Sequence, residues 1–445
     1  MKKNTSHVLQ HMLWRGLYFF SVLVINIGIA RLFGAERSGQ IFILVNNLAI
    51  VLLVVSLSLE AGATFFIASG KINASEMANF LILWTVIVSL LAIAGWGYIV
   101  GFPTSVRSDS SHILGGFFFL SGVLLTTYFT SLFYSKKEFA LPNKILFIVN
   151  MILIISLFSM KYFRIVQIYF IELYFVSFFT QGLVLVLVFY NKNLGFSIFK
   201  YPSRFVLKTI IRYSLFALVA NLAYFLVNRI DYWFVKYYCS PDGLGNYIQA
   251  SKIAQMMLIV PSILGSTLFP IFSYGYKSEN QPQLTAVIRV LVFINAGICL
   301  LILATGWYLI PLIFGHSFDQ MYLLFVFLIP GILCVTINYP MAAWFSSSNR
   351  IGINLKGALL ALVFICLGDL IALPHYGVIM ASIVSSAGYF IITVYTYYIF
   401  QKENALPWKD FLIVRKSDLL KILTAIRIKS NNLSSEEATI QNSTL

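Results

Sequence analysis

The sequence predicts an all-α integral membrane protein with about twelve transmembrane helices. Of its 445 residues, 59% are hydrophobic and only 11% are charged, and the mean hydropathy is +0.86. Roughly 25% of the residues of an ordinary soluble protein are charged, so this composition excludes a soluble globular enzyme. The net charge of +15 favours cytoplasmic loops, anionic lipid or an anionic substrate as its counterpart.

The predicted spans are apolar stretches of about 20 residues, the length that a helix needs to cross about 30 Å of hydrocarbon. Most connections between them are short, so no loop has room for a soluble catalytic domain. The twelve stretches are 9–31, 40–60, 79–101, 113–134, 144–160, 165–190, 211–235, 246–273, 286–313, 320–340, 353–373 and 376–400.

The distribution of Lys and Arg predicts the orientation, because cytoplasmic loops carry an excess of these residues. Segment 191–210 is basic through Lys192, Lys200, Arg204 and Lys208. We therefore expect this segment and both termini to be cytoplasmic. In the tail, 417–428 has apolar residues at helical spacing beside basic ones, which predicts a short interfacial helix before a disordered end.

An internal repeat relates the two halves of the chain. A shift of 206 residues aligns 31–41 with 237–247, so that Gly39 falls on Gly245. Each half contains six spans, which makes the halves parallel repeats about an axis along the membrane normal. The predicted domains are an N-terminal six-helix bundle at 1–195, a C-terminal six-helix bundle at 196–400 and a cytoplasmic tail at 401–445.

A family resemblance becomes specific at the predicted seventh and eighth helices. The passages NRID at 228–231, SPDGLGNY at 240–247 and ASKIA at 250–254 resemble the corresponding helices of polysaccharide flippases, and LFG at 32–34 is the matching turn of the first half. Over about residues 8–400 the chain resembles O-antigen (Wzx-type) flippases of the MATE-like superfamily of multidrug, oligosaccharide-lipid and polysaccharide exporters. The resemblance implies two six-helix bundles in a V around a central cavity, and export of an undecaprenyl-diphosphate-linked oligosaccharide.

Polar residues inside the spans are candidates for substrate binding, because exposing them to lipid is costly. On helix seven, Asn221, Tyr224, Asn228 and Asp231 fall within about 80° of one another, and Arg229 flanks them. This stripe predicts a cavity lining. The alternative is hydrogen bonding that holds helices together without touching substrate.

Three further spans place polar residues at helical spacing. Lys252 on helix eight suits an anionic ligand or, alternatively, a structural pair with Asp231 or Glu60. Arg15 on helix one lines the cavity or extends to the cytoplasmic interface. Asn46 and Glu60 are predicted to share one face of helix two. The candidate substrate-binding residues are Arg15, Asn26, Asn46, Asn221, Tyr224, Asn228, Arg229, Asp231, Gln249, Lys252 and Gln255.

Carboxylates within the spans are candidates for ion coupling, and Glu172 is the most isolated of them. The four candidates are Glu60, Glu172, Asp231 and Asp369. Arg289 is predicted to be an anchor that extends to the inner interface. We expect no metal and no cofactor, and since the sequence has no Walker motif, the driving force is expected to be an H⁺ or Na⁺ gradient or the gradient of the substrate itself.

The sequence therefore favours a flippase of the bacterial inner membrane that acts on a lipid-linked oligosaccharide in contact with membrane lipid, and not an enzyme. A polysaccharide polymerase and a chain-length regulator are possible partners, and nucleic acid is not expected. One alternative is a multidrug or cation antiporter of the same superfamily. Another is a lipid II flippase, which usually has fourteen spans. A polysaccharide polymerase or ligase would need a long periplasmic loop, and a scaffold would need no aligned intramembrane stripe.

Overall fold

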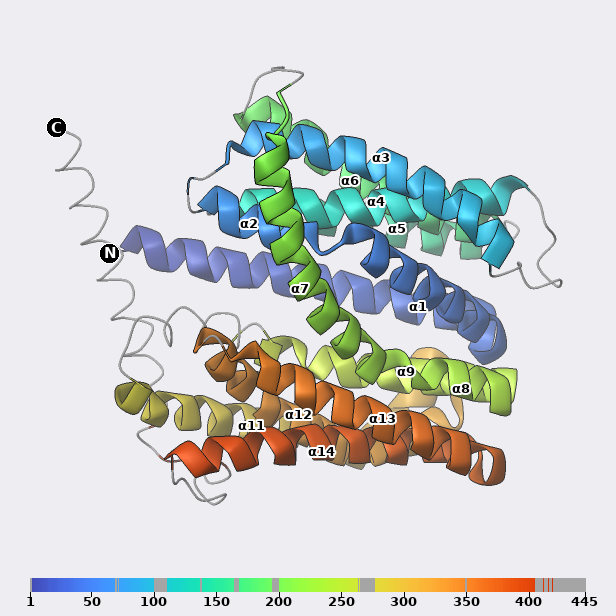
Figure 1. Cartoon of the computed structure of the whole chain (residues 1–445). Coiled ribbons are helices and arrows are strands. Elements are labelled where there is room, and N and C mark those ends of the chain that lie inside the picture. The colour runs from blue at the N-terminus through green and yellow to red at the C-terminus, as the bar shows by residue number, and fades with distance from the viewer. Residues whose placement is uncertain are drawn as a thin grey trace. The chain divides into compact units, whose positions relative to one another are not determined.

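The computed structural model consists of helices throughout the part of the chain that it describes (Figure 1). The described residues are 2–68, 70, 72–99, 110–136, 138–163, 168–193, 200–262, 264, 277–348, 350–404, 411, 415 and 418. The helices are α1 (Lys2–Ser56), α2 (Leu59–Ala68), α3 (Ala74–Ile99), α4 (Ser110–Ser135), α5 (Ala140–Phe163), α6 (Ile168–Asn193), α7 (Arg204–Arg229), α8 (Asp231–Tyr238), α9 (Pro241–Met257), α11 (Lys277–Phe314), the 3₁₀ turn η1 (His316–Phe318), α12 (Met321–Ser347), α13 (Ile351–Tyr376) and α14 (Val378–Asn404).

Ten helical runs within the described residues are long and apolar enough to cross a membrane. The run Leu13–Ser56 covers most of the first two predicted spans, 9–31 and 40–60, because the helix continues past the turn between them. The eighth predicted span, 246–273, begins in α9 and continues into residues outside the described part. The chain is therefore a multi-pass membrane protein, as its composition predicts.

The turn between the first two predicted spans is a sharp kink at Gly34. Its backbone has φ 69° and ψ −179°, a conformation that residues with a Cβ rarely adopt. The amide of Ala35, which follows the kink, donates to the Ser317 hydroxyl at 3.1 Å. The LFG passage of the sequence thus supplies the one residue type that turns here without strain.

The chain divides into two compact units, which we describe separately. The C-terminal unit comprises Met1–Thr5, Phe33–Ile43 and Ala223–Leu445, and the N-terminal unit comprises Ser6–Leu32 and Leu44–Leu222. The dividing point lies inside α7, whereas the repeat alignment places its boundary at 195/196. The repeat-based halves describe internal similarity, which a division by contacts does not test, so they stay a prediction.

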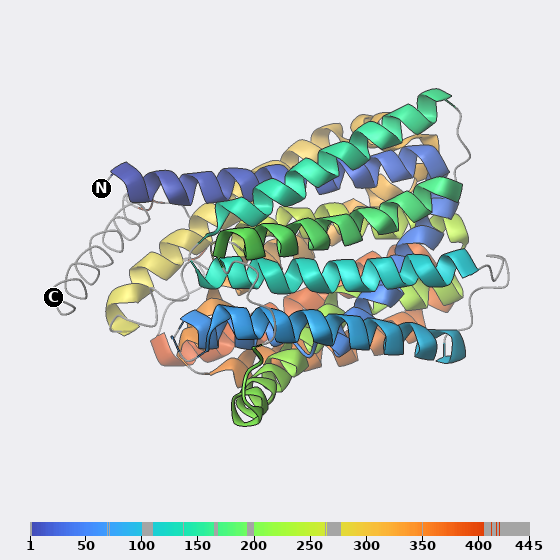
Figure 2. The same ribbon diagram turned by 90° about the horizontal axis from the view of Figure 1, so that it is seen from above.

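In the N-terminal unit, α4 packs lengthwise against α6 and α3. Seen from above in Figure 2, α3 (blue) and α4 (cyan) run side by side. Gly122 of α4 allows the closest approach, since a Cβ there would lie 2.3 Å from the amide nitrogen of Phe179 on α6. Aromatic rings fill the core beside this contact, with Phe129 and Phe133 both edge-on to Phe189.

The second predicted span is interrupted in the structure. Helix α1 ends at Ser56, Leu57 and Ser58 both have φ 50°, and α2 begins at Leu59. The carbonyls freed by the break accept hydrogen bonds from Trp84 Nε1 at 3.0 Å and Tyr128 Oη at 2.9 Å. The predicted continuous helix over 40–60 is therefore wrong.

In the C-terminal unit, the two glycines that the repeat alignment superposes pack against each other. A Cβ on Gly39 would lie 2.8 Å from the amide nitrogen of Gly245, and a Cβ on Gly245 would lie 1.9 Å from the Ala35 carbonyl oxygen. The Ser240 hydroxyl accepts from the Gly243 amide at 3.1 Å and caps the start of α9. The SPDGLG passage thus combines a helix start with a close backbone contact.

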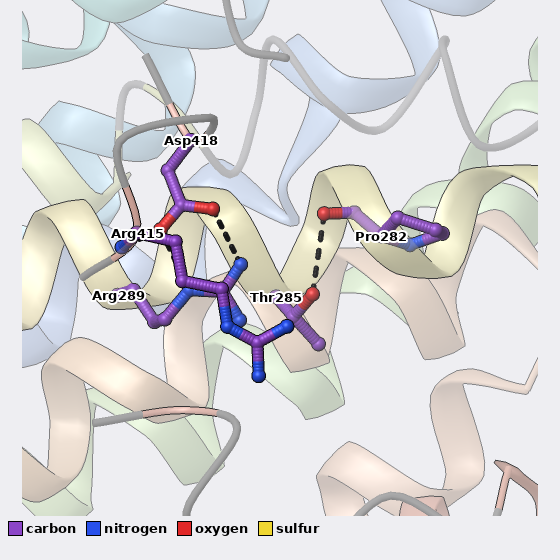
Figure 3. Close-up of polar contacts among 5 residues, drawn as sticks. All are labelled: Pro282, Thr285, Arg289, Arg415 and Asp418. Atoms are coloured by element: carbon purple, nitrogen blue, oxygen red, sulfur yellow. Dashed lines mark hydrogen bonds and ion pairs between the residues drawn. The ribbon is translucent and has the colours of Figure 1, made fainter. Parts of the chain in front are cut away.

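A buried ion pair joins Asp418 of the tail to Arg289 of α11 (Figure 3). Arg289 Nε and Nη2 donate to the two carboxylate oxygens of Asp418 at 2.8 and 2.5 Å, and the two side chains are 2% and 0% exposed. Phe411 is also buried, with its ring 5.6 Å from that of Tyr397.

Arg289 is therefore not an anchor that extends to the interface, because a tail carboxylate meets it inside the protein. The predicted interfacial helix at 417–428 lies, apart from Asp418, outside the described residues.

Candidate functional site

The centre of the candidate site is Asp231, the first residue of α8. Its Oδ2 accepts hydrogen bonds from the hydroxyl of Tyr247 on α9 and from that of Ser385 on α14, the latter at 2.8 Å. The two hydroxyls are 3.1 Å apart. Asp231 is 1% exposed, and its Oδ1 has no hydrogen-bond partner among the described residues. These contacts place the carboxylate inside the C-terminal unit and agree with the helix-joining alternative.

A second carboxylate, Asp369 of α13, lies within electrostatic range of Asp231 and Tyr247. Asp369 is fully buried, and neither of its oxygens has a hydrogen-bond partner among the described residues. Burying a carboxylate without compensation is costly, so such a group takes up a proton or a cation. The C-terminal unit thus holds a pair of buried acids with unused acceptor capacity.

Next to this pair, a set of amides and hydroxyls connects α7, α9 and α14. Asn228 Oδ1 accepts from the Tyr389 hydroxyl at 3.3 Å, and the Asn228 carbonyl accepts from Gln255 Nε2 at 3.4 Å. Gln255 also donates to the hydroxyls of Tyr232 and Ser251, both at 3.3 Å. The structure therefore brings together Asn228 and Gln255, which the sequence predicts on different helices.

Lys252 lies over an aromatic ring. Its Nζ is 2.9 Å from the centroid of Phe42, a residue of the segment that the N-terminal half contributes to the C-terminal unit. Arg229 is close enough to Lys252 for the two cations to repel each other. The Arg229 guanidinium itself lies 5.3 Å from the Phe225 ring. This arrangement concentrates positive charge beside aromatic surfaces.

In the N-terminal unit, polar groups gather at the break between α1 and α2. Asn221 Nδ2 donates to the Ser58 hydroxyl at 3.1 Å. Glu60 is in the first turn of α2, and its Oε2 is buried without a hydrogen-bond partner among the described residues. Because the helix is interrupted, Asn46 and Glu60 do not share a continuous helical face, and that prediction is wrong. Asn221 likewise belongs to this unit, whereas Asn228 and Asp231 belong to the other.

The remaining candidates are distributed over both units. Arg15 has its guanidinium 5.9 Å from the Phe19 ring, and Asn26 Nδ2 donates to the Val22 carbonyl at 2.9 Å. Gln249 and Asn46 are each 1% exposed. The substrate-binding role of these residues stays a prediction. The same holds for substrate binding by Tyr224, whose ring contacts that of Tyr339, and for ion coupling by Glu172, which is partly exposed on α6.

Five hydroxyl residues of the network are missing from the site candidates of the sequence analysis: Tyr232, Tyr247, Ser251, Ser385 and Tyr389. A signal for the last two exists, because Ser382, Ser385, Tyr389 and Thr393 recur at helical spacing along α14. Hydroxyl residues of this kind commonly bond their own helix backbone, as the Thr393 hydroxyl does with the Tyr389 carbonyl at 2.8 Å. Within the described residues, no three His, Cys, Asp or Glu side chains gather as a metal site.

Comparison with known proteins agrees with this fold. Residues 112–323, a little under half of the chain, match the family of polysaccharide biosynthesis proteins. The capsular polysaccharide biosynthesis protein CapF of Staphylococcus aureus is 22% identical over 159 residues, which are 34% of this chain and 40% of that protein. The match thus spans less than half the length of this curated relative.

Solved structures of transporters share the fold over nearly the whole chain. The MATE transporter VcmN of Vibrio cholerae, in a mutant form, has a TM-score of 0.64 and 15% identity, covering 92% of this chain and 100% of that one. The lipid II flippase MurJ, in an inward closed conformation, has a TM-score of 0.67 and 14% identity, covering 98% and 99%. Identities this low establish the fold alone.

The fold is therefore the one that the MATE transporter and lipid II flippase structures share. In sequence, part of the chain is similar to polysaccharide biosynthesis proteins, through the family match at 112–323 and the similarity to CapF. The solved structures that share the fold are those of membrane transporters and of a lipid flippase.

Proposed function

We propose that this chain moves an undecaprenyl-diphosphate-linked oligosaccharide, the repeat unit of O-antigen or another surface polysaccharide, from the cytoplasmic to the periplasmic leaflet by alternating access. The observation that supports this most is the match of 112–323 to polysaccharide biosynthesis proteins in a chain with the fold of a lipid flippase. The protein acts in the bacterial inner membrane with both termini in the cytoplasm. A polysaccharide polymerase and a chain-length regulator are its expected partners.

The chemistry of the polar residues suits such a headgroup. A sugar diphosphate is large, polar and anionic, so its passage needs cations and hydrogen-bonding groups in place of water. Lys252 and Arg229 supply neighbouring positive charges in the C-terminal unit. Asn228 and Gln255 offer amides for sugar hydroxyls, and the aromatic rings beside the cations offer faces for sugar rings.

The buried acid pair is the proposed coupling site. Asp369 has two unused oxygens and Asp231 has one, and Ser385 already donates to Asp231. Uptake of H⁺ or Na⁺ neutralises a charge whose burial is otherwise costly. A cation that enters here from one side and leaves to the other couples its gradient to the conformational change. Glu60 and Glu172 are the remaining candidates for this role.

A multidrug or cation antiporter is the second candidate, favoured by the structural similarity to MATE transporters. A pocket for cationic drugs needs acidic and aromatic linings. The adjacent cations Lys252 and Arg229 disfavour that assignment, because they would repel a cationic substrate.

Complementation of surface polysaccharide in a strain lacking this gene tests the proposal, with immunoblotting for protein abundance. We expect Lys252→Ala and Arg229→Ala to lose export at normal abundance. The matched control is Lys356→Ala, which removes an exposed lysine of α13. Lys252→Arg separates a requirement for charge from one for bidentate phosphate geometry.

Two outcomes would contradict this assignment of Lys252. One is wild-type export from Lys252→Ala. The other is loss of the protein that Asp231→Asn restores, since that identifies a structural Lys–Asp pair. Drug resistance conferred without polysaccharide export would favour the antiporter instead.

A further inference from the structure

The first half of α7 (green in Figure 1) carries an open groove in the N-terminal unit. The groove has a volume of about 810 Å³. Its cationic side chains are Arg204, Lys208 and Arg212, which we call the α7 strip, and Leu207, Ile211 and Leu215 are apolar lining. The strip residues follow one another at intervals of four, so they lie on one side of the helix.

The other side of α7 is the one that packs. Ile210 and Ser214 are buried, and a Cβ on Gly62 of α2 would lie 2.8 and 2.5 Å from their side chains. At about 100° per residue, the α7 strip is turned roughly 120° or more away from Ile210. The strip therefore faces outward from the N-terminal unit while the helix is held from behind.

The positive charges of the α7 strip are not neutralised by carboxylates among the described residues. Its three side chains are exposed, and within the described ranges none of them forms an ion pair, whereas nearby Lys192 pairs with Glu138 at 2.9 Å. The sequence has no Asp or Glu from residue 173 to residue 230. An anion from outside the chain is therefore the natural counterpart of these charges.

The strip extends along the helix and is not confined to one level of it. At 1.5 Å per residue, Arg212 lies about 12 Å along the helix from Arg204. Arg204 is the first residue of the run Arg204–Tyr238, which contains an apolar window long enough to cross a membrane, and apolar side chains alternate with the cations. A ligand that fits this groove has a multiply charged head and a long hydrocarbon tail.

We infer that the α7 strip is a docking site for an isoprenoid diphosphate lipid, with the diphosphate on the cations and the chain along the apolar side chains. A phospholipid with one phosphodiester would leave cations of the strip uncompensated, whereas a diphosphate brings a second phosphate. The inference rests on the proposed function and adds a place on the N-terminal unit where the carrier lipid is held.

Binding of farnesyl diphosphate to the purified full chain in detergent, measured by native mass spectrometry and thermophoresis, tests the inference. Farnesol, inorganic diphosphate and phosphatidylglycerol are the comparison probes. The variant Arg204→Gln/Lys208→Gln/Arg212→Gln should bind farnesyl diphosphate on the order of a hundredfold more weakly, at about fivefold per cation. The matched control, Lys236→Gln/Lys356→Gln/Lys402→Gln, removes the same charge from exposed positions elsewhere and should bind like wild type.

Single Lys208→Gln and the charge-keeping Arg204→Lys/Arg212→Lys guard against a triple variant that fails to fold. The first should weaken binding about fivefold, and the second should retain most of it. Unchanged affinity in the strip variants, an equal loss in the control, or equally tight strip-dependent binding of phosphatidylglycerol would overturn the inference.

The export assay keeps the two proposals apart. If wild type restores surface polysaccharide while strip variants bind farnesyl diphosphate normally, the docking site alone is refuted. If wild type neither restores export nor binds the diphosphate, both proposals fail.

Discussion

Two buried carboxylates in the C-terminal unit, Asp418 and Asp369, are treated by the protein in opposite ways. Asp418 accepts two hydrogen bonds from Arg289 and a third from the Arg415 amide at 2.7 Å. Asp369 is as thoroughly buried, yet neither of its oxygens has a partner among the described residues. Asp418 therefore has the contacts of a structural ion pair, whereas Asp369 has two acceptor oxygens that no described residue uses.

The difference separates stability from function. A paired buried charge is strongly destabilising to break, because its partner is left uncompensated. An unpaired buried acid weakens the fold whenever it is ionised, so its retention calls for a purpose other than stability. Asp231 is intermediate, since one oxygen accepts from Tyr247 and Ser385 while the other has no described partner.

The largest effect we expect is on export, from Asp369→Asn. The amide keeps the size of the side chain and removes its charge and its proton-accepting capacity. Export should be lost while thermal stability in detergent is unchanged or higher. The measurement pairs complementation with a melting curve by size-exclusion chromatography. Retention of full export would remove Asp369 from the coupling site.

Arg289→Met should have the opposite profile, with the largest effect on stability. It leaves Asp418 buried without its cation, which costs about 3–5 kcal/mol. The double variant Arg289→Met/Asp418→Leu removes both charges and should recover most of that loss. Denaturation in mixed micelles measures it, together with protease sensitivity of the tail. A single variant as stable as wild type would show that the pair contributes nothing.

Asp231→Asn tests the intermediate case. The amide oxygen of Asn can still accept from Tyr247 and Ser385, but these hydrogen bonds lose the carboxylate charge, which should cost about 1–2 kcal/mol, the range for hydrogen bonds to a charged group offset by relief of burial. Export should fall less in Tyr247→Phe than in Asp231→Asn, because the phenol only orients the carboxylate. Equal export in the two variants would contradict a coupling role for Asp231.

Much of the fold was predictable from the sequence, because hydrophobicity determines which segments cross a membrane. The turn at Gly34 and the start of α9 follow from LFG and SPDG, whose residues have strong local preferences. The break after Ser56 was not predictable, since VSLSLE at 55–60 has the composition of an ordinary apolar stretch. The carbonyls at the break lose their partners within the helix, and hydrogen bonds from Trp84 and Tyr128 on other helices compensate for that loss.

The site was predictable in part for the same physical reason. Asp231, Asn228 and Gln255 are conspicuous as polar residues in apolar spans, and the structure brings them into one region of the C-terminal unit. Their partners Ser385 and Tyr389 are inconspicuous, because hydroxyl residues are common in membrane helices. Arg289 was misassigned because its partner Asp418 is 129 residues away in a tail without hydrophobic signal.

The smallest effect on stability is expected from breaking a partly exposed ion pair, which serves as a comparison for the buried Arg289–Asp418 pair. Arg350 and Glu403 also form an ion pair, but their side chains are 36% and 33% exposed. Water already solvates both charges, so Arg350→Met should cost about 0–1 kcal/mol and should leave export unchanged. The same denaturation assay compares it with Arg289→Met. If the two substitutions cost the same, burial is not what gives the Arg289–Asp418 pair its strength, and the contrast with Asp369 loses its physical basis.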